Sequence, residues 1–179
     1  MSRLTIYADD TPQQPQLRTE DPEAIARELG RIGVRFERWD SPVALAEDAA
    51  PDTVLAAYKP FLDTLMGTSR AGSADVIRLD PENPNAPALR QKFISEHTHT
   101  EDEIRFFVRG AGSFIMHVDG RIFDAHCTAG DLISVPANTK HWFDAGERPS
   151  FTALRIFTDT SGWVPHYTGD TVSERFPAL

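Results

Sequence analysis

The sequence has one cysteine, no long apolar run and no surplus of basic residues. Cys127 stands alone among 179 residues, so no internal disulfide can form, and this fits a reducing compartment. The N-terminus lacks the basic and then apolar pattern of a secretory signal peptide. No stretch approaches the roughly 18 consecutive apolar residues of a membrane-spanning helix. These absences predict a cytoplasmic protein with no membrane partner.

The balance of charge excludes a further class of partner. The formal net charge is -9, whereas nucleic-acid phosphates require concentrated Lys and Arg side chains. A chain of this length fits one domain with its own core. We therefore expect a monomer that binds no nucleic acid. Its single domain (1–179) would comprise a helix-rich N-terminal part, a core of short strands and a C-terminal segment: 1–92, 93–158 and 159–179.

The N-terminal part reads as mixed and helix-rich. One helical pattern has Asp21 as its N-cap and Pro22 in its first turn, and Gly33 offers its end. A second helix over 51–66 should kink or break at Pro60. Two short strands and a brief helix are expected besides: 34–39, 75–79 and 89–93.

After residue 97 the pattern changes to short segments rich in aromatic and β-branched residues, separated by turn signals. Asp119-Gly120 is a favourable two-residue hairpin turn. Such segments predict an antiparallel sandwich or barrel. The fold should be mainly β, with packed N-terminal helices and strands over these ranges: 103–108, 113–118, 121–126, 131–136, 141–145 and 151–157.

The stretch "SEHTHTEDEIRFFVRG" (95–110) predicts most of a metal site. Side chains two apart in a strand share a face, so His97 and His99 can chelate one ion. A turn would bring Glu103 back at the start of the next strand, and His141 would join from a later strand. These four residues give three imidazoles and one carboxylate, without thiolate. Such a set suits Fe, Ni, Mn or Co, and Zn less distinctively.

Arg105 alternates with Glu103 and should share its inward face. A guanidinium beside the ion would favour the anionic form of a ligand bound there. A salt bridge to Asp102 or another acid is the alternative for Arg105. The orientation of Arg155 stays open.

Other side chains have plainer interpretations. Histidines outside the set are read as surface or core residues, and Cys127 as structural because no base or cation adjoins it. Some aromatic residues either form an apolar wall beside the ion or belong to the ordinary core. The histidines are His117, His126 and His166, and the aromatic residues are Phe107, Trp142 and Phe143.

The metal constellation resembles the cupin pattern. The match runs through His97, His99, Glu103, Gly110, Gly130, Pro136 and His141. The sequence departs from the pattern at three positions that are not ligands: Gln91, Asn138 and Ala145. Asn138 stands where the pattern has glycine, and asparagine tolerates a left-handed backbone. The departures leave the predicted ligand set untouched.

Longer blocks resemble the bacterial acireductone dioxygenase family of cupins. They are "GVRFERW", "FISEHTHTEDEIRFFVRGAGSF", "DLISVPANTKHWFDAG", "FTALRIF" and "YTGD". The resemblance implies a cupin-type antiparallel β-barrel (jelly roll) that holds one Fe(II) or Ni(II) ion per chain. It also implies cleavage of the acireductone 1,2-dihydroxy-5-(methylthio)pent-1-en-3-one by O2 in methionine salvage. Fe(II) would give 4-methylthio-2-oxobutanoate and formate, and Ni(II) 3-(methylthio)propanoate, formate and carbon monoxide.

The same resemblance implies catalytic contributions from three residues. Arg105 matches a residue associated with forming the substrate dianion, Glu96 one associated with metal incorporation, and Asp102 one associated with relaying local conformational change. Two rival functions stay open. One is another cupin metalloenzyme, such as a different dioxygenase, a decarboxylase or a sugar isomerase. The other is a cupin sensor without enzymatic activity.

Overall fold

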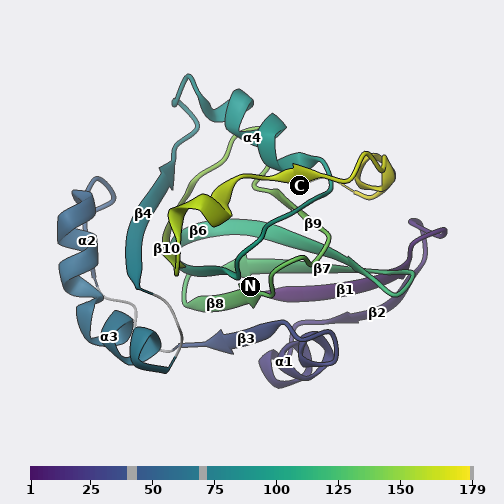
Figure 1. Cartoon of the computed structure of the whole chain (residues 1–179), viewed down its shortest axis with the longest axis horizontal. Helices are drawn as coiled ribbons and strands as arrows, with labels where there is room; N and C mark the ends of the chain where they lie inside the picture. Colours follow the sequence, from purple (N-terminus) through teal and green to yellow (C-terminus); the bar gives the residue numbers. More distant parts are fainter. Residues whose placement is uncertain (40–43, 69–71, 178–179) are drawn as a thin grey trace.

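The computed structural model describes residues 1–39, 44–68 and 72–177. Within these residues every strand pair is antiparallel, and two sheets share the long strand β6 (Glu103–Val118). The predicted mainly-β cupin-type fold is confirmed (Figure 1). β6 runs through the middle of the molecule and carries side chains to both sheets.

The first sheet has the order β11-β5-β9-β6-β7-β1-β2. Besides β6 its strands are β1 (Arg3–Ala8), β2 (Pro15–Thr19), β5 (His97–Thr98), β7 (Arg121–Thr128), β9 (His141–Asp144) and β11 (His166–Tyr167). The predicted turn at Asp119 and Gly120 joins β6 to β7, and both residues have positive φ angles (51° and 69°). These angles are those of a type I′ hairpin turn.

The second sheet has the order β3-β8-β6-β10-β4. Its further strands are β3 (Arg35–Arg38), β4 (Ser73–Leu79), β8 (Asp131–Val135) and β10 (Phe151–Phe157). The largest hydrophobic cluster joins residues of both sheets, among them Leu4, Phe114 and Ile133, which are fully buried. A second cluster fills the space between this sheet and the helices beside it.

Helices cover the second sheet and one end of the first. α1 (Pro22–Gly30) begins at Asp21, whose carboxylate accepts a hydrogen bond from Glu23 N as a cap. The predicted break near Pro60 is confirmed, because α2 (Pro51–Ala57) ends just before α3 (Lys59–Thr68) begins. α2 and α3 lie beside β4, and α4 (Ala86–Ile94) lies over β9 (Figure 1). None of the described helices has the length and apolar character that a bilayer crossing requires.

Two strands near the N-terminus were not predicted from the sequence. Leu4 and Ile6 on β1 are fully buried in the largest hydrophobic cluster, and β1 pairs with β7 on one side and with β2 on the other. Their alternation is only two apolar residues long, and polar residues surround it. The partner strand β7 comes more than 100 residues later. The sequence pattern around β1 therefore gives no sign of its pairing with β7.

Gly110 marks the point where β6 leaves one sheet and enters the other. β6 pairs with β10 up to Gly110 and with β7 from Ala111 onward. Gly110 has a φ of +74°, and a Cβ atom there would collide with the backbone of Ser150 and lie 2.7 Å from Phe151 Cα. Only glycine both adopts this positive φ readily and leaves room for the backbone of Ser150 and Phe151. The position of residues 103–105 relative to the second half of β6 therefore depends on a bend at Gly110 that any side chain there would obstruct.

We predict that Gly110→Ala destabilises the protein by about 3 kcal/mol or more, since it combines a strained φ with a backbone collision. Gly30→Ala is the matched control, because nothing lies within 4 Å of a Cβ added at Gly30. Urea denaturation of both variants and the parent protein measures the difference. Equal midpoints for the two variants would contradict this account of the bend.

Candidate metal centre

Pairing of short strands brings the predicted histidines together. β5 begins with His97 and β9 with His141, and these two residues lie directly opposite each other in the sheet. His99 follows β5 immediately, and Glu103 is the first residue of β6. The loop between β5 and β6 is thus short enough to return Glu103 to the histidines. Residues 97 and 141 meet only because of this strand register.

Each imidazole is oriented by a backbone carbonyl. The Nδ1–H groups donate to Ser95 O (from His97, 2.7 Å), Val164 O (from His99, 3.2 Å) and Thr139 O (from His141, 2.8 Å). Because a carbonyl oxygen can only accept, Nδ1 carries the proton in each ring. The Nε2 lone pair is then the one available to a metal ion, as in most histidine metal sites.

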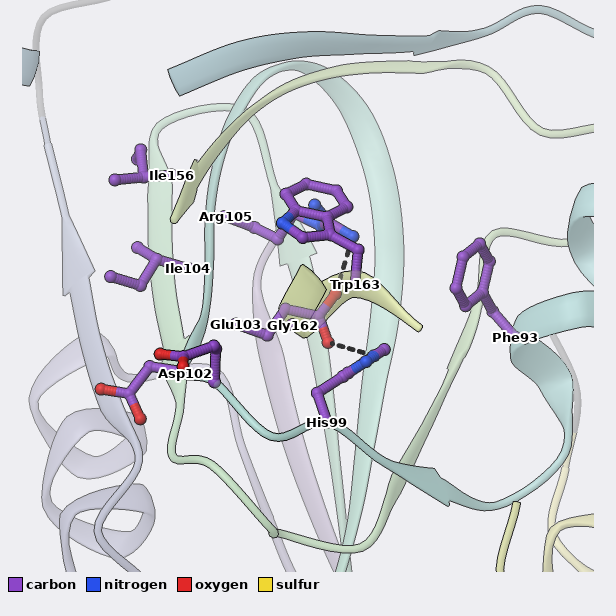
Figure 2. Close-up of a pocket in the computed structure, with 10 residues that line it drawn as sticks. Phe93, His99, Asp102, Glu103, Ile104, Arg105, Ile156, Gly162 and Trp163 are labelled. Atoms are coloured by element: carbon purple, nitrogen blue, oxygen red, sulfur yellow. Dashed lines mark hydrogen bonds and ion pairs between the residues drawn. The ribbon is translucent and has the colours of Figure 1, made fainter. Parts of the chain in front are cut away.

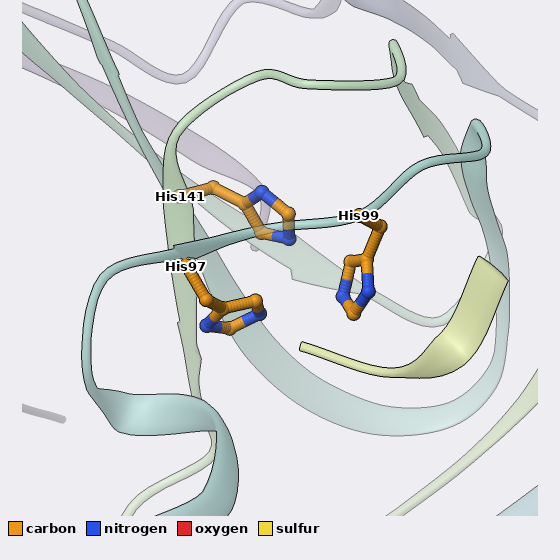
Figure 3. Close-up of side chains that lie close together, drawn as sticks. All are labelled: His97, His99 and His141. Carbon is orange, nitrogen blue, oxygen red and sulfur yellow. The ribbon is translucent and has the colours of Figure 1, made fainter. Parts of the chain in front are cut away.

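The three rings converge in the interior. Their ligand atoms all lie within 4.8 Å of one another, and the side chains are almost fully buried (Figure 3). Glu103 Oε2 lies 2.8 Å from His141 Nε2 and 3.4 Å from His99 Nε2. Three imidazole nitrogens and a carboxylate oxygen in this arrangement fit one divalent ion of the nitrogen- and oxygen-binding class.

Burial keeps two of the histidines ready to bind a metal. Burial first, and the neighbouring His141 next, lower the pKa of His97 to about 4. Burial also lowers the pKa of His99, although the Glu103 carboxylate partly opposes this. Both rings are therefore neutral near pH 7, and their nitrogens need not lose a proton before they coordinate.

Glu103 is held as a carboxylate. Burial alone would raise its pKa, but the Arg105 guanidinium and His141 outweigh burial and hold the pKa well below the ordinary value. Burial likewise acts to lower the pKa of His141, yet the bond to Glu103 raises it. Glu103 is thus an anion placed between the guanidinium of Arg105 and the imidazole of His141.

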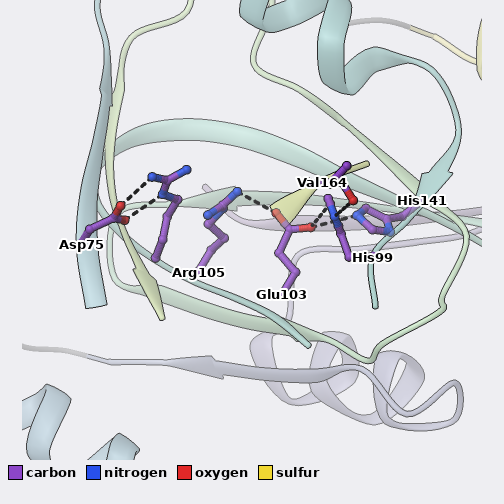
Figure 4. Close-up of polar contacts among 7 residues, drawn as sticks. Asp75, His99, Glu103, Arg105, His141 and Val164 are labelled. Carbon is purple, nitrogen blue, oxygen red and sulfur yellow. Dashed lines mark hydrogen bonds and ion pairs between the residues drawn. The ribbon is translucent and has the colours of Figure 1, made fainter. Parts of the chain in front are cut away.

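Arg105 lies beside Glu103, as strand alternation predicted. Its Nη2 donates to Glu103 Oε1 at 2.7 Å (Figure 4). Its Nη1 is buried and has no hydrogen-bond partner within the described ranges. Burial lowers the pKa of Arg105, but a guanidinium stays charged in proteins. A buried donor without a partner is expensive, so this nitrogen is available to a bound ligand.

Trp163 joins Arg105 to a second arginine. The indole ring lies 4.9 Å from the Arg105 guanidinium and 3.6 Å from that of Arg155. Arg155 also donates twice to Asp75, at 2.8 and 2.6 Å, which settles its open orientation. Sequence reasoning missed Trp163, because it reaches the site through a 3-10 turn (Thr160–Trp163) rather than a patterned strand.

Glu96 and Asp102 lie outside the cluster of rings. Glu96 is buried and accepts from Thr168 Oγ1 at 2.7 Å, and its other oxygen lies 2.6 Å from His117 Nδ1. With Asp170, Glu96 and His117 form a second group able to hold an ion. Asp102 Oδ1 accepts from Ala137 N at 2.8 Å, which joins the β5–β6 loop to the β8–β9 loop.

Two cavities meet at Glu103 and Arg105. The smaller, about 330 Å³, runs past His99 and is bordered by Trp163 and Gly162 (Figure 2). The larger, about 640 Å³, passes His97 and is walled by aliphatic and aromatic side chains. Of the aromatic residues considered from the sequence, Phe107 and Phe143 line it. Trp142 does not, since it packs against Phe176 on the other side of the sheet, with centroids 6.4 Å apart.

Cys127 has the structural role that was predicted. It is fully buried in the hydrophobic core, and burial raises the pKa of its thiol well above the ordinary value. A buried, protonated thiol is neither a nucleophile nor a ready ligand. The described site therefore contains nitrogen and oxygen donors only.

Comparison with known proteins gives a consistent result along the whole chain. The ARD/ARD' family model matches residues 3–165. An acireductone dioxygenase of Granulibacter bethesdensis is 69% identical over 178 residues, which are 99% of each chain. One of Acidiphilium cryptum is 63% identical over 177 residues, covering 99% of this chain and 98% of that one.

A solved structure agrees with the fold. The acireductone dioxygenase from Bacillus anthracis, which has a cadmium ion in its active centre, superposes with a TM-score of 0.79. It is 31% identical and covers 93% of this chain and 98% of its own. The family match, the two close relatives and the shared fold lead to one conclusion. This chain belongs to the ARD/ARD' family of acireductone dioxygenases.

Proposed function

We propose that this protein is an acireductone dioxygenase of methionine salvage. Its substrates would be 1,2-dihydroxy-5-(methylthio)pent-1-en-3-one and O2. The observation that supports this most directly is the position of Arg105. A buried guanidinium nitrogen without a partner lies next to three convergent imidazoles and a carboxylate. An ion and a fixed cation side by side suit a substrate that binds as an oxygen anion.

We propose that His97, His99, Glu103 and His141 bind one Fe(II) or Ni(II) ion per chain. Held by these four residues, the metal would supply Lewis-acid chemistry and a template for the two substrate oxygens. The family resemblance implies that the metal sets the products. Fe(II) would yield 4-methylthio-2-oxobutanoate and formate, and Ni(II) 3-(methylthio)propanoate, formate and carbon monoxide.

Arg105 would stabilise the deprotonated enediol. Its Nη2 is occupied by Glu103, so Nη1 is the donor left for a substrate oxygen. Charge and hydrogen bonding from a buried guanidinium favour the anion, which is a better reductant toward O2. Trp163 and Arg155 would keep this guanidinium in place. The methylthioalkyl tail would extend into the apolar cavity lined by Phe107 and Phe143.

Glu96 and Asp102 would act on the site from outside. Glu96 directly precedes the first proposed ligand, His97, and it makes a buried contact with His117. Both facts support a role in metal incorporation. Asp102 links two loops that flank the site, and this supports a role in relaying conformational change. We also propose that 1–179 forms one cupin-type domain, with 93–158 as its metal-binding core. A monomer located in the cytoplasm stays a prediction.

The assignment predicts activity that depends on the metal. After chelation and separate reloading with Fe(II) or Ni(II), the full-length protein should accelerate acireductone loss under oxygen, with carbon monoxide formed only by the Ni(II) form. Measured loss and headspace gas test both statements. A rate equal to the spontaneous one with both metals would refute the proposed function.

The ligand assignment predicts loss of metal from single variants. His97→Ala should bind metal at least about a hundredfold more weakly, because even residues behind the ligands change affinity by 10- to 100-fold. His126→Ala is the control, since His126 lies on β7 away from the three rings. Metal per chain after gel filtration, measured by mass spectrometry, distinguishes them. Full occupancy of His97→Ala would remove this residue from the ligand set.

Arg105→Ala should keep its metal and lose turnover by about 10²- to 10³-fold, the usual effect of removing one donor to a developing oxyanion. Arg105→Lys should recover only part of the rate, because an ammonium cannot reproduce both guanidinium contacts. Arg148→Ala is the control, since Arg148 is exposed and pairs with Glu82 at the surface. Normal kinetics in metal-loaded Arg105→Ala would make Arg105 a bystander.

A further inference from the structure

The larger cavity has a polar end and an apolar end. His97, Glu103 and Arg105 lie at its polar end. The remaining wall is mostly aliphatic and aromatic, with four phenylalanine rings: Phe93, Phe107, Phe143 and Phe151. Arg90 also lines the cavity, but its guanidinium is paired with Asp144 at 3.0 and 3.1 Å. A ligand that fills this space should therefore be polar where it meets Arg105 and mainly apolar along the rest. The dimensions of the apolar end therefore decide which tails fit.

Phe143 forms one wall of the apolar end. Its ring packs against Phe114 with centroids 4.9 Å apart, and edge-to-face against Phe151 at 5.6 Å. Phe114 and Phe151 are buried in the core, whereas Phe143 is only half-buried and faces the cavity. The cavity is thus the direction in which the Phe143 ring has room to move.

Gly112 lies behind the Phe143 ring. A Cβ atom at Gly112 would lie 2.5 Å from Phe143 Cζ and 2.8 Å from Cε2, whereas ordinary contact begins at 3.4 Å. Gly112 does not line the cavity, so the ring of Phe143 separates it from the ligand space. Gly112 is not among the glycines with positive φ, unlike Gly110. The φ angle of Gly112 therefore does not require glycine, and alanine at this position is opposed by the space that the ring occupies.

We propose that Gly112 is a specificity-determining residue, which sets the length of substrate tail by fixing the position of Phe143. This inference rests on the proposed function, because it concerns the tail of the acireductone. A methyl group at position 112 pushes the ring edge toward the cavity and shortens the apolar end. The three atoms nearest to this methyl group belong to the rings of Phe143 and Phe107, so it does not meet the four proposed ligands or Arg105 directly.

The effect should be a change of preference rather than a loss of chemistry. One methylene in an apolar pocket changes kcat/KM by about 10- to 200-fold. Gly112→Ala should therefore shift the ratio of kcat/KM by about tenfold or more toward an acireductone whose tail is one methylene shorter. Phe143→Leu should shift it the opposite way, toward a tail one methylene longer. The double variant Gly112→Ala/Phe143→Leu should return near the parent ratio, because the smaller side chain leaves room for the methyl group.

The experiment compares acireductones with shortened, natural and lengthened tails on the metal-loaded, full-length parent protein and variants. Gly30→Ala is the matched control, since an added Cβ meets nothing there. Inhibition by straight-chain carboxylic acids of graded length gives a second readout of the same cavity. Thermal melting of each variant shows whether it is folded.

The outcomes separate the two proposals. A parent protein that turns over none of the acireductones refutes the proposed function. An active parent whose tail preference is unchanged in folded Gly112→Ala overturns the inference about Gly112 alone. If Gly112→Ala does not fold, Phe143→Leu decides: a shift toward longer tails supports control by the Phe143 wall, and an unchanged preference overturns it.

Discussion

The centre of this protein depends on one buried carboxylate, Glu103. It accepts from the Arg105 guanidinium on one side and adjoins the imidazoles of His141 and His99 on the other. An unpaired charge at this depth would be costly, so Glu103 needs positive charge beside it, which Arg105 supplies and a bound ion would add. A neutral side chain at position 103 would leave Arg105 as a buried cation without a partner.

Strand β6 makes this arrangement possible because it belongs to both sheets. Its first residues, Glu103 and Arg105, face the site, and the bend at Gly110 then carries the strand into the other sheet beside β9. β9 in turn supplies His141 and, two residues later, Phe143. The adjacent strands β6 and β9 thus each carry one proposed ligand and one residue of the apolar wall: Glu103 with Phe107, and His141 with Phe143. One rigid framework would therefore hold both ends of the proposed substrate.

The sequence allowed the central strands, the hairpin turn, the helix break and the convergence of His97, His99, Glu103 and His141 to be predicted, since each has a local signal. Strand β1 and the position of Trp163 could not be predicted. The first depends on pairing with β7, more than 100 residues away, and the second on a short 3-10 turn. The role of Gly112 was equally hidden, because it follows from how closely the Phe143 ring approaches in three dimensions.

We propose that three imidazoles and Glu103 hold one ion, with Arg105 directed at its open side. A crystal structure of the Ni(II)-loaded protein tests it most directly. We expect one ion bound by Nε2 of His97, His99 and His141 and by a carboxylate oxygen of Glu103, with Arg105 Nη1 facing the remaining positions. An ion bound instead at the Glu96, His117 and Asp170 group, or bound by fewer than three of these imidazoles, would contradict it.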